Sequence, residues 1–517
     1  MQLEAFLERS AARFPEKTAL VCGERRFTYA EVEARANLLA HALIELGVER
    51  GDRVAIHLDN DVEAVIAIFA ALKAGAVFLM VNPTTKADKL AYILNNSRAA
   101  ALIAPGRKLR TLDSLWSETP HLRIVMGVGE TPAEPHDARK RFVQFDEQLA
   151  AFADRATPPE KRCIDIDLAA LIYTSGSTGN PKGVMLTHLN MVAAATSITT
   201  YLEMREDDIV IGLLPISFDY GLYQVLMTFK LGGTLVLEKS FAFPHSILET
   251  IVRERVTGFP IVPTIAAILL QTDLSKYDFS RLRFLTNTAA VLPTEHIQRL
   301  RNLFPAARLF SMYGLTECKR VSYLPPEQLD IRPDSVGRGM PNEEVYIVDD
   351  AGNRVGPGVV GELVVRGANV MKGYWELPEA TAERLKPGPL PNEMILHTGD
   401  LFRADDEGWL YFVGRKDDIV KSRGEKVSPK EVENVLHSHP AVAEAAVIGV
   451  PDPILGQAVK ALVTLRAEHE ASERDLLRHC AAHLEDYMIP KHLEIRETLP
   501  KTGNGKIDKR MLAAAAT

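Results

Sequence analysis

Segments with helical spacing alternate with short apolar runs along the chain. Residues 29–47 read YAEVEARANLLAHALIELG, in which apolar side chains return every three or four positions, as on one face of a helix. Residues 53–58 read RVAIHL, a run typical of a buried strand. Leu3, Phe6 and Leu7 have the spacing of an amphipathic opening helix. This alternation predicts an α/β fold built in layers.

The pattern changes near residues 405–418, which read DDEGWLYFVGRKDD. A turn is followed there by a short aromatic strand and then by charged residues, as expected at a domain boundary. The residues beyond it have β and α patterns of their own, such as EAAVIGV at 444–450. The sequence therefore predicts a large N-terminal domain of layered α/β subdomains and a small α+β C-terminal domain.

Composition and charge narrow the function classes. The chain has 517 residues, 46% hydrophobic and 25% charged, which is enough for two or three packed units. A net charge of -8 provides no basic surface for a phosphate backbone, so nucleic acid is excluded as a partner. Charges interrupt the apolar stretches of residues 1–20, so we expect neither a signal-peptide core nor a membrane span there. Four widely spaced cysteines without a CxxC pair favour a reducing, cytoplasmic setting.

The most informative segment is residues 168–190, LAALIYTSGSTGNPKGVMLTHLN. An apolar strand runs into a loop of threonine, serine and glycine, and a helical pattern follows. Glycines let backbone N–H groups approach an anion, hydroxyls add donors, and Lys182 adds charge. The residues concerned are Thr174, Ser175, Gly176, Ser177, Thr178, Gly179 and Gly183. The loop matches neither the Walker A pattern nor GxGxxG. An isolated SGSTG is also typical of a flexible turn, but the longer string predicts polyphosphate binding.

With this loop and the motifs that follow it, the chain resembles the AMP-forming adenylating superfamily, which contains acyl-CoA synthetases, the adenylation domains of nonribosomal peptide synthetases, and luciferases. The resemblance runs from the first helix to a lysine motif near the C-terminus, and the motifs come in the family's order. It implies an ATP-dependent enzyme that uses Mg²⁺, forms an acyl-adenylate from a carboxylic acid, and passes the acyl group to a thiol.

Residues 313–317 read YGLTE, and the resemblance implies that this segment holds the nucleotide. In the family the tyrosine, here Tyr313, stacks on adenine, and the threonine, here Thr316, contacts the α-phosphate. The glutamate, here Glu317, holds Mg²⁺, and Gly314 lies within the same motif. An aromatic face suits a purine, and a hard carboxylate oxygen suits a magnesium ion that keeps most of its waters. Alone, YGLTE would be typical of an ordinary strand-to-turn segment, but its place downstream of the phosphate loop favours nucleotide binding.

Two further residues are implied at the ribose. Residues 397–400 read HTGD, and Asp400 matches the family's aspartate that accepts hydrogen bonds from both ribose hydroxyls. Arg415 matches the arginine that binds the ribose and phosphate. An aspartate outside such a series is more often a turn residue or a helix cap.

The resemblance also implies a moving C-terminal domain. Asp417 falls where the family has its hinge, which divides the chain into residues 1–416 and 417–517. Lys506, within LPKTGNGKIDKR, aligns with the family's adenylation lysine, whose amine bridges the attacking carboxylate and the α-phosphate. In a second half-reaction the small domain would turn, withdraw this lysine, and bring Lys421 and Gly424 beside a channel for the thiol.

The predicted acyl pocket begins at residues 213–229, LLPISFDYGLYQVLMTF, with Phe218, Asp219 and Tyr223 as candidate lining residues. Many acyl- and aryl-CoA synthetases have histidine where this chain has Phe218, whereas amino-acid-activating domains have phenylalanine followed by an aspartate that pairs with the substrate ammonium. Asp219 therefore either binds a substrate amine, because a buried carboxylate needs a cationic partner, or only caps the following helix. Thr288 and Ala289 replace smaller residues of the family and favour a small or compact acid.

Three hypotheses remain. The first is an acid–thiol ligase of the acyl-CoA synthetase kind, acting on a small acyl or aryl acid or an amino acid. The second is a stand-alone enzyme that adenylates an amino acid, for example proline, and loads a peptidyl carrier protein. The third, an inactive ATP-binding relative, is disfavoured by the joint presence of Lys182, Glu317, Asp400, Arg415 and Lys506. Coenzyme A and carrier proteins present the same phosphopantetheine thiol, so the acceptor stays open.

Overall fold

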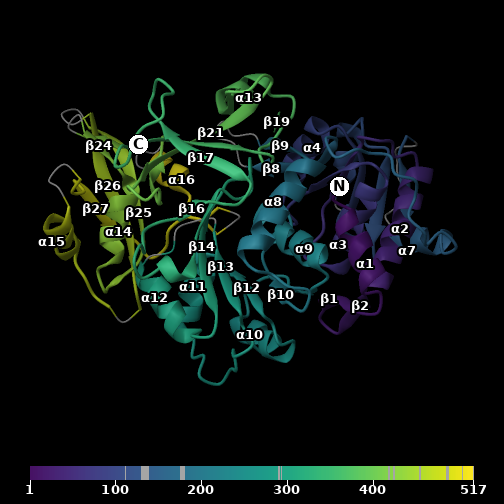
Figure 1. Ribbon diagram of the computed structural model, residues 1–517, viewed down its shortest axis with the longest axis horizontal. Helices are drawn as coiled ribbons and strands as arrows, with labels where there is room; N and C mark the ends of the chain where they lie inside the picture. The colour runs from purple at the N-terminus through teal and green to yellow at the C-terminus, as the bar shows by residue number, and fades with distance from the viewer. Residues whose placement is uncertain are drawn as a thin grey trace.

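The computed structural model describes residues 1–110, 112–129, 139–174, 181–288, 292, 294–416, 420–422, 425–452, 456–467, 469–484, 488–502 and 505–515. Four β-sheets with helices on their faces make up the described part of the chain (Figure 1). Three of the sheets belong to the large N-terminal part and the fourth to a smaller C-terminal part. The α/β fold with a small second domain predicted from the alternating pattern is confirmed.

The first large sheet has eight strands in the order β19-β9-β8-β4-β3-β5-β6-β7. Its strands pair in parallel except at β8–β9 and β9–β19. Their bounds are β3 Arg53–Ile56, β4 Val77–Met80, β5 Ala99–Pro105, β6 Ile124–Val128, β7 Arg141–Gln144, β8 Leu168–Thr174, β9 Lys182–Thr187 and β19 Gly373–Tyr374. The predicted strand at 53–58 is therefore β3, and the strand predicted before the phosphate loop is β8.

The second large sheet has nine strands in the order β16-β15-β14-β13-β12-β10-β11-β1-β2. Its central strands, β14 through β1, are parallel, and both edges are antiparallel. The bounds are β1 Thr18–Cys22, β2 Arg25–Thr28, β10 Ile209–Gly212, β11 Thr234–Leu237, β12 Gly258–Ile261, β13 Phe284–Asn287, β14 Arg308–Tyr313, β15 Ser322–Leu324 and β16 Arg338–Gly339. Parallel strands of this kind are buried on both faces, which explains their continuous apolar runs.

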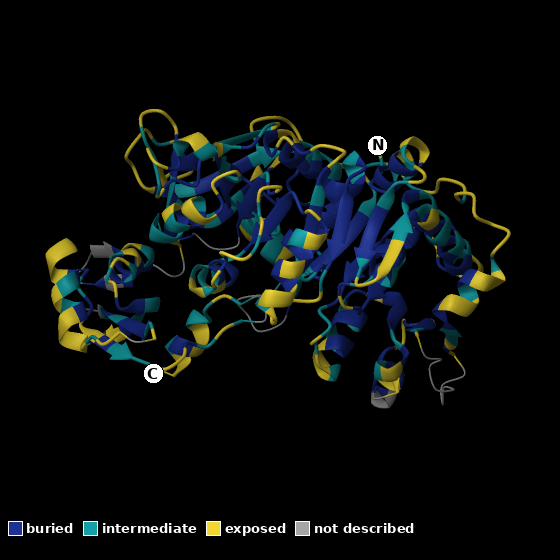
Figure 2. Ribbon diagram, turned by 90° about the horizontal axis from the view of Figure 1, so that it is seen from below, coloured by how far each residue is buried: buried dark blue, intermediate teal, exposed yellow. Residues whose placement is uncertain are grey.

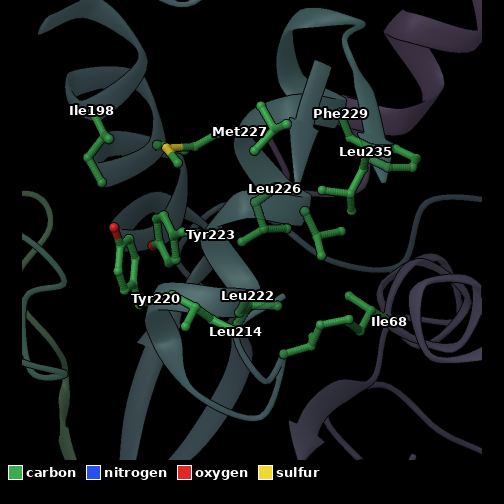
Figure 3. Packing of buried hydrophobic residues seen from close by; sticks show 14 of the residues in the cluster. Ile68, Ile198, Leu214, Tyr220, Leu222, Tyr223, Leu226, Met227, Phe229 and Leu235 are labelled. Carbon is green, nitrogen blue, oxygen red and sulfur yellow. The ribbon is translucent and has the colours of Figure 1, made fainter. Parts of the chain in front are cut away.

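Helices buried on nearly every side fill the space between these two sheets. In α3 (Val62–Lys73) and α9 (Asp219–Leu231) almost every side chain is buried, as expected of helices without a polar face. The helix α3 contacts β3 and β4 of the first sheet, whereas α9 contacts β10 and β11 of the second. Figure 3 shows the resulting cluster, in which α9 side chains meet Ile68 and Ile198.

The remaining helices of the N-terminal part cover the outer faces of the sheets or join their strands. The predicted helix at 29–47 is α2, and its capping box between Thr28 and Glu31 explains where it begins. The bounds are α1 Ala5–Arg13, α2 Tyr29–Glu45, α4 Ala87–Asn96, α5 Gly106–Leu109, α6 Asp113–Glu118, α7 Phe145–Ala151, α8 His188–Tyr201, α10 Pro244–Arg253, α11 Pro263–Gln271, α12 Thr294–Leu303, η1 Pro326–Gln328 and α13 Pro378–Arg384.

A third, antiparallel sheet leads to the end of the large part. Its order is β17-β18-β21-β20, with β22 paired to β21. The bounds are β17 Glu343–Val348, β18 Gly361–Gly367, β20 Leu385–Pro387, β21 Met394–Ala404 and β22 Leu410–Arg415. The predicted turn and aromatic strand at 405–418 correspond to the β21–β22 hairpin.

The C-terminal part has hydrophobic clusters of its own, separate from the main core. Figure 2 shows its buried strands grouped near the C-terminus. The bounds are β23 Val420–Ser422, β24 Glu425–Val427, α14 Pro429–His437, β25 Val442–Asp452, β26 Gly456–Leu465, α15 Glu473–His483, β27 His492–Ile495 and α16 Lys509–Ala514. In the described part of the chain, no helix combines the length and the apolar content that a membrane crossing requires.

Candidate active site

The β8–β9 hairpin holds both ends of the predicted phosphate loop. The two strands pair antiparallel, with Thr174 directly opposite Lys182. The loop residues Ser175, Gly176, Ser177, Thr178 and Gly179 lie outside the described residues, so their phosphate contacts stay predictions. The hairpin register alone brings the first hydroxyl and the cation of the predicted loop to the same end of the sheet.

Lys182 begins β9 and Glu317 lies in the turn after β14, but the two share one neighbour, Tyr374. The Tyr374 phenol donates a hydrogen bond to Glu317 Oε1 at 2.7 Å, and Lys182 Nζ lies 5.4 Å from the centre of the Tyr374 ring. Burial, together with the Glu317 carboxylate, raises the pKa of Tyr374, so its phenol remains a donor at neutral pH. The fold thus gathers two predicted catalytic residues around a tyrosine that no sequence motif singled out.

Glu317 fits the magnesium-binding role that the resemblance implies. Its carbonyl accepts a hydrogen bond from the Met371 amide at 2.7 Å, which holds the backbone in place. Oε1 is occupied by Tyr374, whereas Oε2 accepts no hydrogen bond from a described residue. No group of three or more histidine, cysteine, aspartate or glutamate side chains among the described residues could hold a metal by itself. A lone carboxylate is consistent with an ion held mainly by phosphate oxygens and water.

Asp400 connects Tyr313 to Arg415. The Tyr313 phenol donates to Asp400 Oδ2 at 2.5 Å, and Arg415 Nε donates to Asp400 Oδ1 at 3.3 Å. Pairing of β21 with β22 places Asp400 opposite Arg415, so the sheet register creates this contact. Burial raises the pKa of Asp400, and the Arg415 guanidinium opposes that shift. Three predicted nucleotide-binding residues are therefore in direct contact.

Two glycines shape this region. A Cβ on Gly314 would lie 2.3 Å from a backbone oxygen, that of Lys319, so the chain closes tightly on itself after β14. Gly399, before Asp400, has a φ of +72° and borders the Arg384 side chain. Glycine is needed at both positions because a side chain would clash or strain the backbone. Thr316 lies half-buried in the segment that follows Gly314.

A carboxylate outside the predicted set holds the HTGD turn. Glu362 Oε1 accepts a hydrogen bond from the Gly399 amide at 2.8 Å, and Oε2 lies 3.4 Å from His397 Nδ1 and 3.6 Å from Lys416 Nζ. Burial alone would raise the pKa of Glu362, but these donors outweigh it and lower the pKa to about 2. Glu362 is thus a charged anchor for the turn that carries Asp400, and nothing in its local sequence distinguished it.

The loop of the C-terminal part that carries Lys506 reaches into the large part. Within the loop, the Thr502 amide donates to the Lys506 carbonyl at 2.7 Å. Gly505 has a φ of +75°, and a Cβ there would lie 3.6 Å from the Thr264 hydroxyl of α11. The predicted glycine-rich loop therefore contacts the large part.

The charges around Lys506 identify where its amine lies. Burial lowers the pKa of Lys506, Asp219 opposes that shift, Arg415 adds to it, and Asp400 opposes it. The Lys506 side chain is exposed, although protein atoms surround much of it. Its amine therefore lies at an open edge of the site. Lys506 thus shares one neighbourhood with the predicted ribose residues and with Asp219 of the predicted acyl pocket.

One ion pair among the described residues joins the two parts. Arg466 Nη2 lies 3.2 Å from Glu295 Oε2 on α12. Nearby, burial lowers the pKa of His437 to about 3, helped by Lys430 and by His296 of the large part. This ion pair links the two parts in the orientation that the structure has.

We expect Glu295→Arg to slow acyl-adenylate formation by roughly two- to fivefold, because an exposed ion pair contributes up to about 1 kcal/mol. Transfer to the thiol from preformed adenylate should be unaffected, since that step does not need this orientation. The double variant Glu295→Arg/Arg466→Glu should restore the first rate. Arg478→Glu, which alters an exposed pair within α15, is the control. If the charge swap restored nothing, this contact would have no part in the orientation.

The predicted acyl-pocket residues lie at the start of α9 and after β13. Phe218 is the N-cap and makes no side-chain cap, and Asp219 is the first helical residue. Asp219 Oδ1 accepts a hydrogen bond from the Tyr220 amide at 3.0 Å, so it contributes to the helix terminus without being the N-cap. Tyr223 and Thr288 are buried.

Several predicted residues fall outside the part of the chain that the structure describes. They are Ala289 of the acyl pocket, Asp417 of the hinge and Gly424 of the thiol channel. Lys421 belongs to β23, but its side chain is among those not described. The hinge and the thiol channel therefore stay predictions.

Two cations next to the YGLTE motif were missed. Lys319 and Arg320 are almost fully buried and follow Cys318 directly. Burial lowers the pKa of Lys319 to about 8, against the opposing effect of Asp219 and Glu317. The available signal in the sequence was the pair of adjacent basic residues directly after the motif. The burial that the structure shows is unusual, because buried lysine and arginine are rare.

Comparisons with known proteins find relatives that match nearly the whole chain. The family model described as AMP-binding enzyme matches residues 7–375, and the one described as AMP-binding enzyme C-terminal domain matches residues 431–506. A long-chain-fatty-acid–CoA ligase of Bacillus subtilis (strain 168) is 32% identical over 100% of this chain and 94% of its own length. Bacitracin synthase 3 of Bacillus licheniformis is 31% identical over 99% of this chain, which corresponds to 8% of that protein.

Among solved structures, the anthranilate CoA ligase AuaEII in complex with anthranoyl-AMP superimposes with a TM-score of 0.89. It is 29% identical, and the match covers 100% of this chain and 97% of that one. The similarity thus extends over both parts of the molecule.

Proposed function

Because this chain belongs to the AMP-binding enzyme family, we propose that the site around Lys506, Asp400 and Glu317 carries out its ATP-dependent, AMP-forming ligase reaction. The observation that carries the proposal is that the Lys506 loop of the C-terminal part approaches Thr264 of the large part, and that the charges of Asp219, Arg415 and Asp400 act on the Lys506 amine. An amine at that point is within reach of both a bound nucleotide and an acid.

The first half-reaction is acyl-adenylate formation. An oxygen of the substrate carboxylate attacks the α-phosphorus of ATP, and the bond to the pyrophosphate oxygen breaks. The Lys506 ammonium holds the carboxylate against the α-phosphate and offsets the charge that builds up there. Electrostatic stabilisation of this kind is usually the largest single contribution to catalysis. Lys182, at the end of the phosphate loop, offsets charge on the departing pyrophosphate.

The nucleotide is held by residues already in contact. Asp400 would accept hydrogen bonds from the ribose hydroxyls and Arg415 would bind ribose and phosphate, while the Tyr313 ring supplies an aromatic face for adenine. Glu317 would hold Mg²⁺ through its second oxygen, and the ion would stabilise charge on the phosphate oxygens. Tyr374 holds the other oxygen of Glu317 in place.

The second half-reaction transfers the acyl group. The thiol sulfur attacks the acyl carbonyl, the thioester forms, and AMP leaves. We propose that Asp417 is the hinge between residues 1–416 and 417–517, and that rotation withdraws Lys506 and brings Lys421 and Gly424 to the thiol. Coenzyme A is the acceptor that the ligase relatives' names give. A carrier protein presents the same thiol arm and is the alternative acceptor.

A second candidate, adenylation of an amino acid for a carrier protein, has two observations in its favour. Asp219 has one carboxylate oxygen beside the substrate region that is not taken by the Tyr220 amide. Bacitracin synthase 3 is among the relatives. A substrate ammonium could pair with the open oxygen of Asp219.

Pyrophosphate exchange into ATP, measured over a panel of small acyl acids, aryl acids and amino acids, tests the proposal. Exchange that requires an added acid supports adenylate formation, and subsequent thioester formation with coenzyme A or a carrier protein identifies the acceptor. Absence of acid-dependent exchange over the panel would favour an inactive ATP-binding relative.

Asp219→Ala distinguishes the two substrate classes. If Asp219 pairs with a substrate ammonium, the variant should lose about 3 kcal/mol or more in kcat/KM for an amino acid, because an unpaired cation stays desolvated. An uncharged acid of the same shape should lose far less. The measurement is the ratio of exchange rates for proline and cyclopentanecarboxylate in parent and variant. If Asp219 only supports the helix terminus, both substrates should change alike and stability should fall by about 1 kcal/mol.

A further inference from the structure

Lys319 places a buried ammonium beside the predicted acyl pocket. Its side chain is 1% exposed, and Nζ has no hydrogen-bond partner among the described residues. An ammonium carries three donors and no acceptor. A buried cation without acceptors is costly, so such groups are normally paired. The next residue, Arg320, donates from Nη1 to the Lys319 carbonyl at 3.0 Å, so it offers a further cation and no acceptor.

The ammonium lies against the helix that opens the acyl pocket. Lys319 Nζ is 5.5 Å from the centre of the Tyr223 ring, and the Arg320 guanidinium carbon is 4.8 Å from the centre of the Tyr220 ring. Both tyrosines belong to α9 and lie on the side of that helix away from Ile68 (Figure 3). The aromatic faces attract the cations but provide no oxygen.

The backbone is held in an unfavourable conformation to present this side chain. Lys319 has a φ of +73°, a left-handed conformation that is strained for a residue with a Cβ. Its carbonyl packs where only the missing side chain of Gly314 leaves room. The tight segment between Gly314 and Lys319 therefore fixes the direction of the lysine.

The neighbouring carboxylates do not satisfy Lys319. Asp219 and Glu317 attract it from a distance, but neither forms an ion pair with it in the part of the chain that the structure describes. Asp219 also raises the pKa of Lys506, so its charge acts on both lysines. Lys506 is open to solvent and would contact the reacting carboxylate of the substrate. Lys319 is buried and would contact the far end of the acyl group.

We propose that the acid activated by this enzyme carries an oxygen acceptor away from its reacting carboxylate, and that Lys319 Nζ donates a hydrogen bond to that oxygen. The substrate class is then a hydroxy, oxo or dicarboxylic acid of small size. This inference rests on the proposed function, because it assigns the substrate of the same site. A pocket built around such a donor rejects the analogue that lacks the oxygen, since the ammonium would stay unpaired.

The test compares matched acids by pyrophosphate exchange: butanoate with 4-hydroxybutanoate, pentanoate with glutarate, and benzoate with its hydroxy derivatives. The parent enzyme should favour the oxygenated member of at least one pair by about tenfold or more in kcat/KM. Lys319→Met keeps the length of the side chain and removes its donors, so this preference should fall toward unity while the plain acid is retained. Lys230→Met is the matched control, because Lys230 lies at the other end of α9 and donates to Thr199.

Other outcomes separate the possibilities. An unchanged ratio in Lys319→Met, or a parent enzyme that favours the plain acid in every pair, would overturn the inference. If Lys319→Met does not fold, Lys319→Gln, which retains an N–H donor without the charge, should lower the preference while the plain acid is retained, and an unchanged preference would overturn the inference. If none of these acids supported pyrophosphate exchange, the proposed function itself would be contradicted.

Discussion

Replacing Lys506 with alanine is expected to lower the rate of acyl-adenylate formation by about 100-fold or more, the size of effect seen when one fixed donor to a developing charge is removed. The charges of Asp219, Asp400 and Arg415 act on the amine in the orientation described, and the proposed mechanism gives it no role once the acyl-adenylate exists. Thioester formation from preformed acyl-adenylate should therefore stay near the parent rate. The two half-reactions are measured separately, by pyrophosphate exchange and by thiol consumption.

Lys501→Ala is the matched control, because Lys501 lies in the same loop but pairs with Glu444 of the C-terminal part. It should leave both half-reactions largely intact. Equal losses in both half-reactions for Lys506→Ala would mean that the lysine stays in the site throughout, and the proposed domain rotation would then be wrong.

Asp400→Ala is expected to lower kcat/KM for ATP by about 100-fold, since removal of one member of a buried charged network costs about 3 kcal/mol. Asp400 is 7% exposed and is the common acceptor for Tyr313 and Arg415. Loss of the Asp400 carboxylate removes one hydrogen-bond acceptor of the Arg415 guanidinium and the proposed acceptor for the ribose hydroxyls. The apparent KM for ATP should rise, whereas that for the acid should change little.

Tyr313→Phe provides the graded comparison. It keeps the aromatic ring that would stack on adenine and removes only the phenol that donates to Asp400 at 2.5 Å. A hydrogen bond to a charged group contributes about 1.5–3 kcal/mol, so the loss should be smaller than that of Asp400→Ala. An unchanged KM for ATP in Asp400→Ala would exclude this carboxylate from ribose binding.

The local elements of the fold could be predicted well, because their signals lie within a few residues. The helical spacing of α2, the apolar run of β3 and the strand before the phosphate loop are visible directly in the chain. Short motifs likewise suggested phosphate binding, nucleotide binding and the adenylation lysine, since the groups that a loop offers to a ligand are those of its own residues.

The charge environment of those motifs could not be predicted in the same way. Tyr374 lies near Lys182 because β19 pairs with β9, and Asp400 meets Arg415 because of the β21–β22 register. The choice of β19 as the partner of β9 depends on packing among segments far apart in the chain, which the spacing within one segment does not encode.

By itself, the sequence determined that this protein is an α/β enzyme with the motifs of an adenylating family, and it placed Asp219 at the start of the helix that is predicted to open the acyl pocket. Only the tertiary structure decided what surrounds Asp219. Lys319 and Lys506 reach it from segments far away along the chain. Secondary-structure propensity and motif residues can be read within a short stretch of sequence. The neighbours of a buried charge depend instead on which elements pack together. The sequence therefore suggested a carboxylate that needs a cationic partner, and the fold shows that the charges of two lysines act near it.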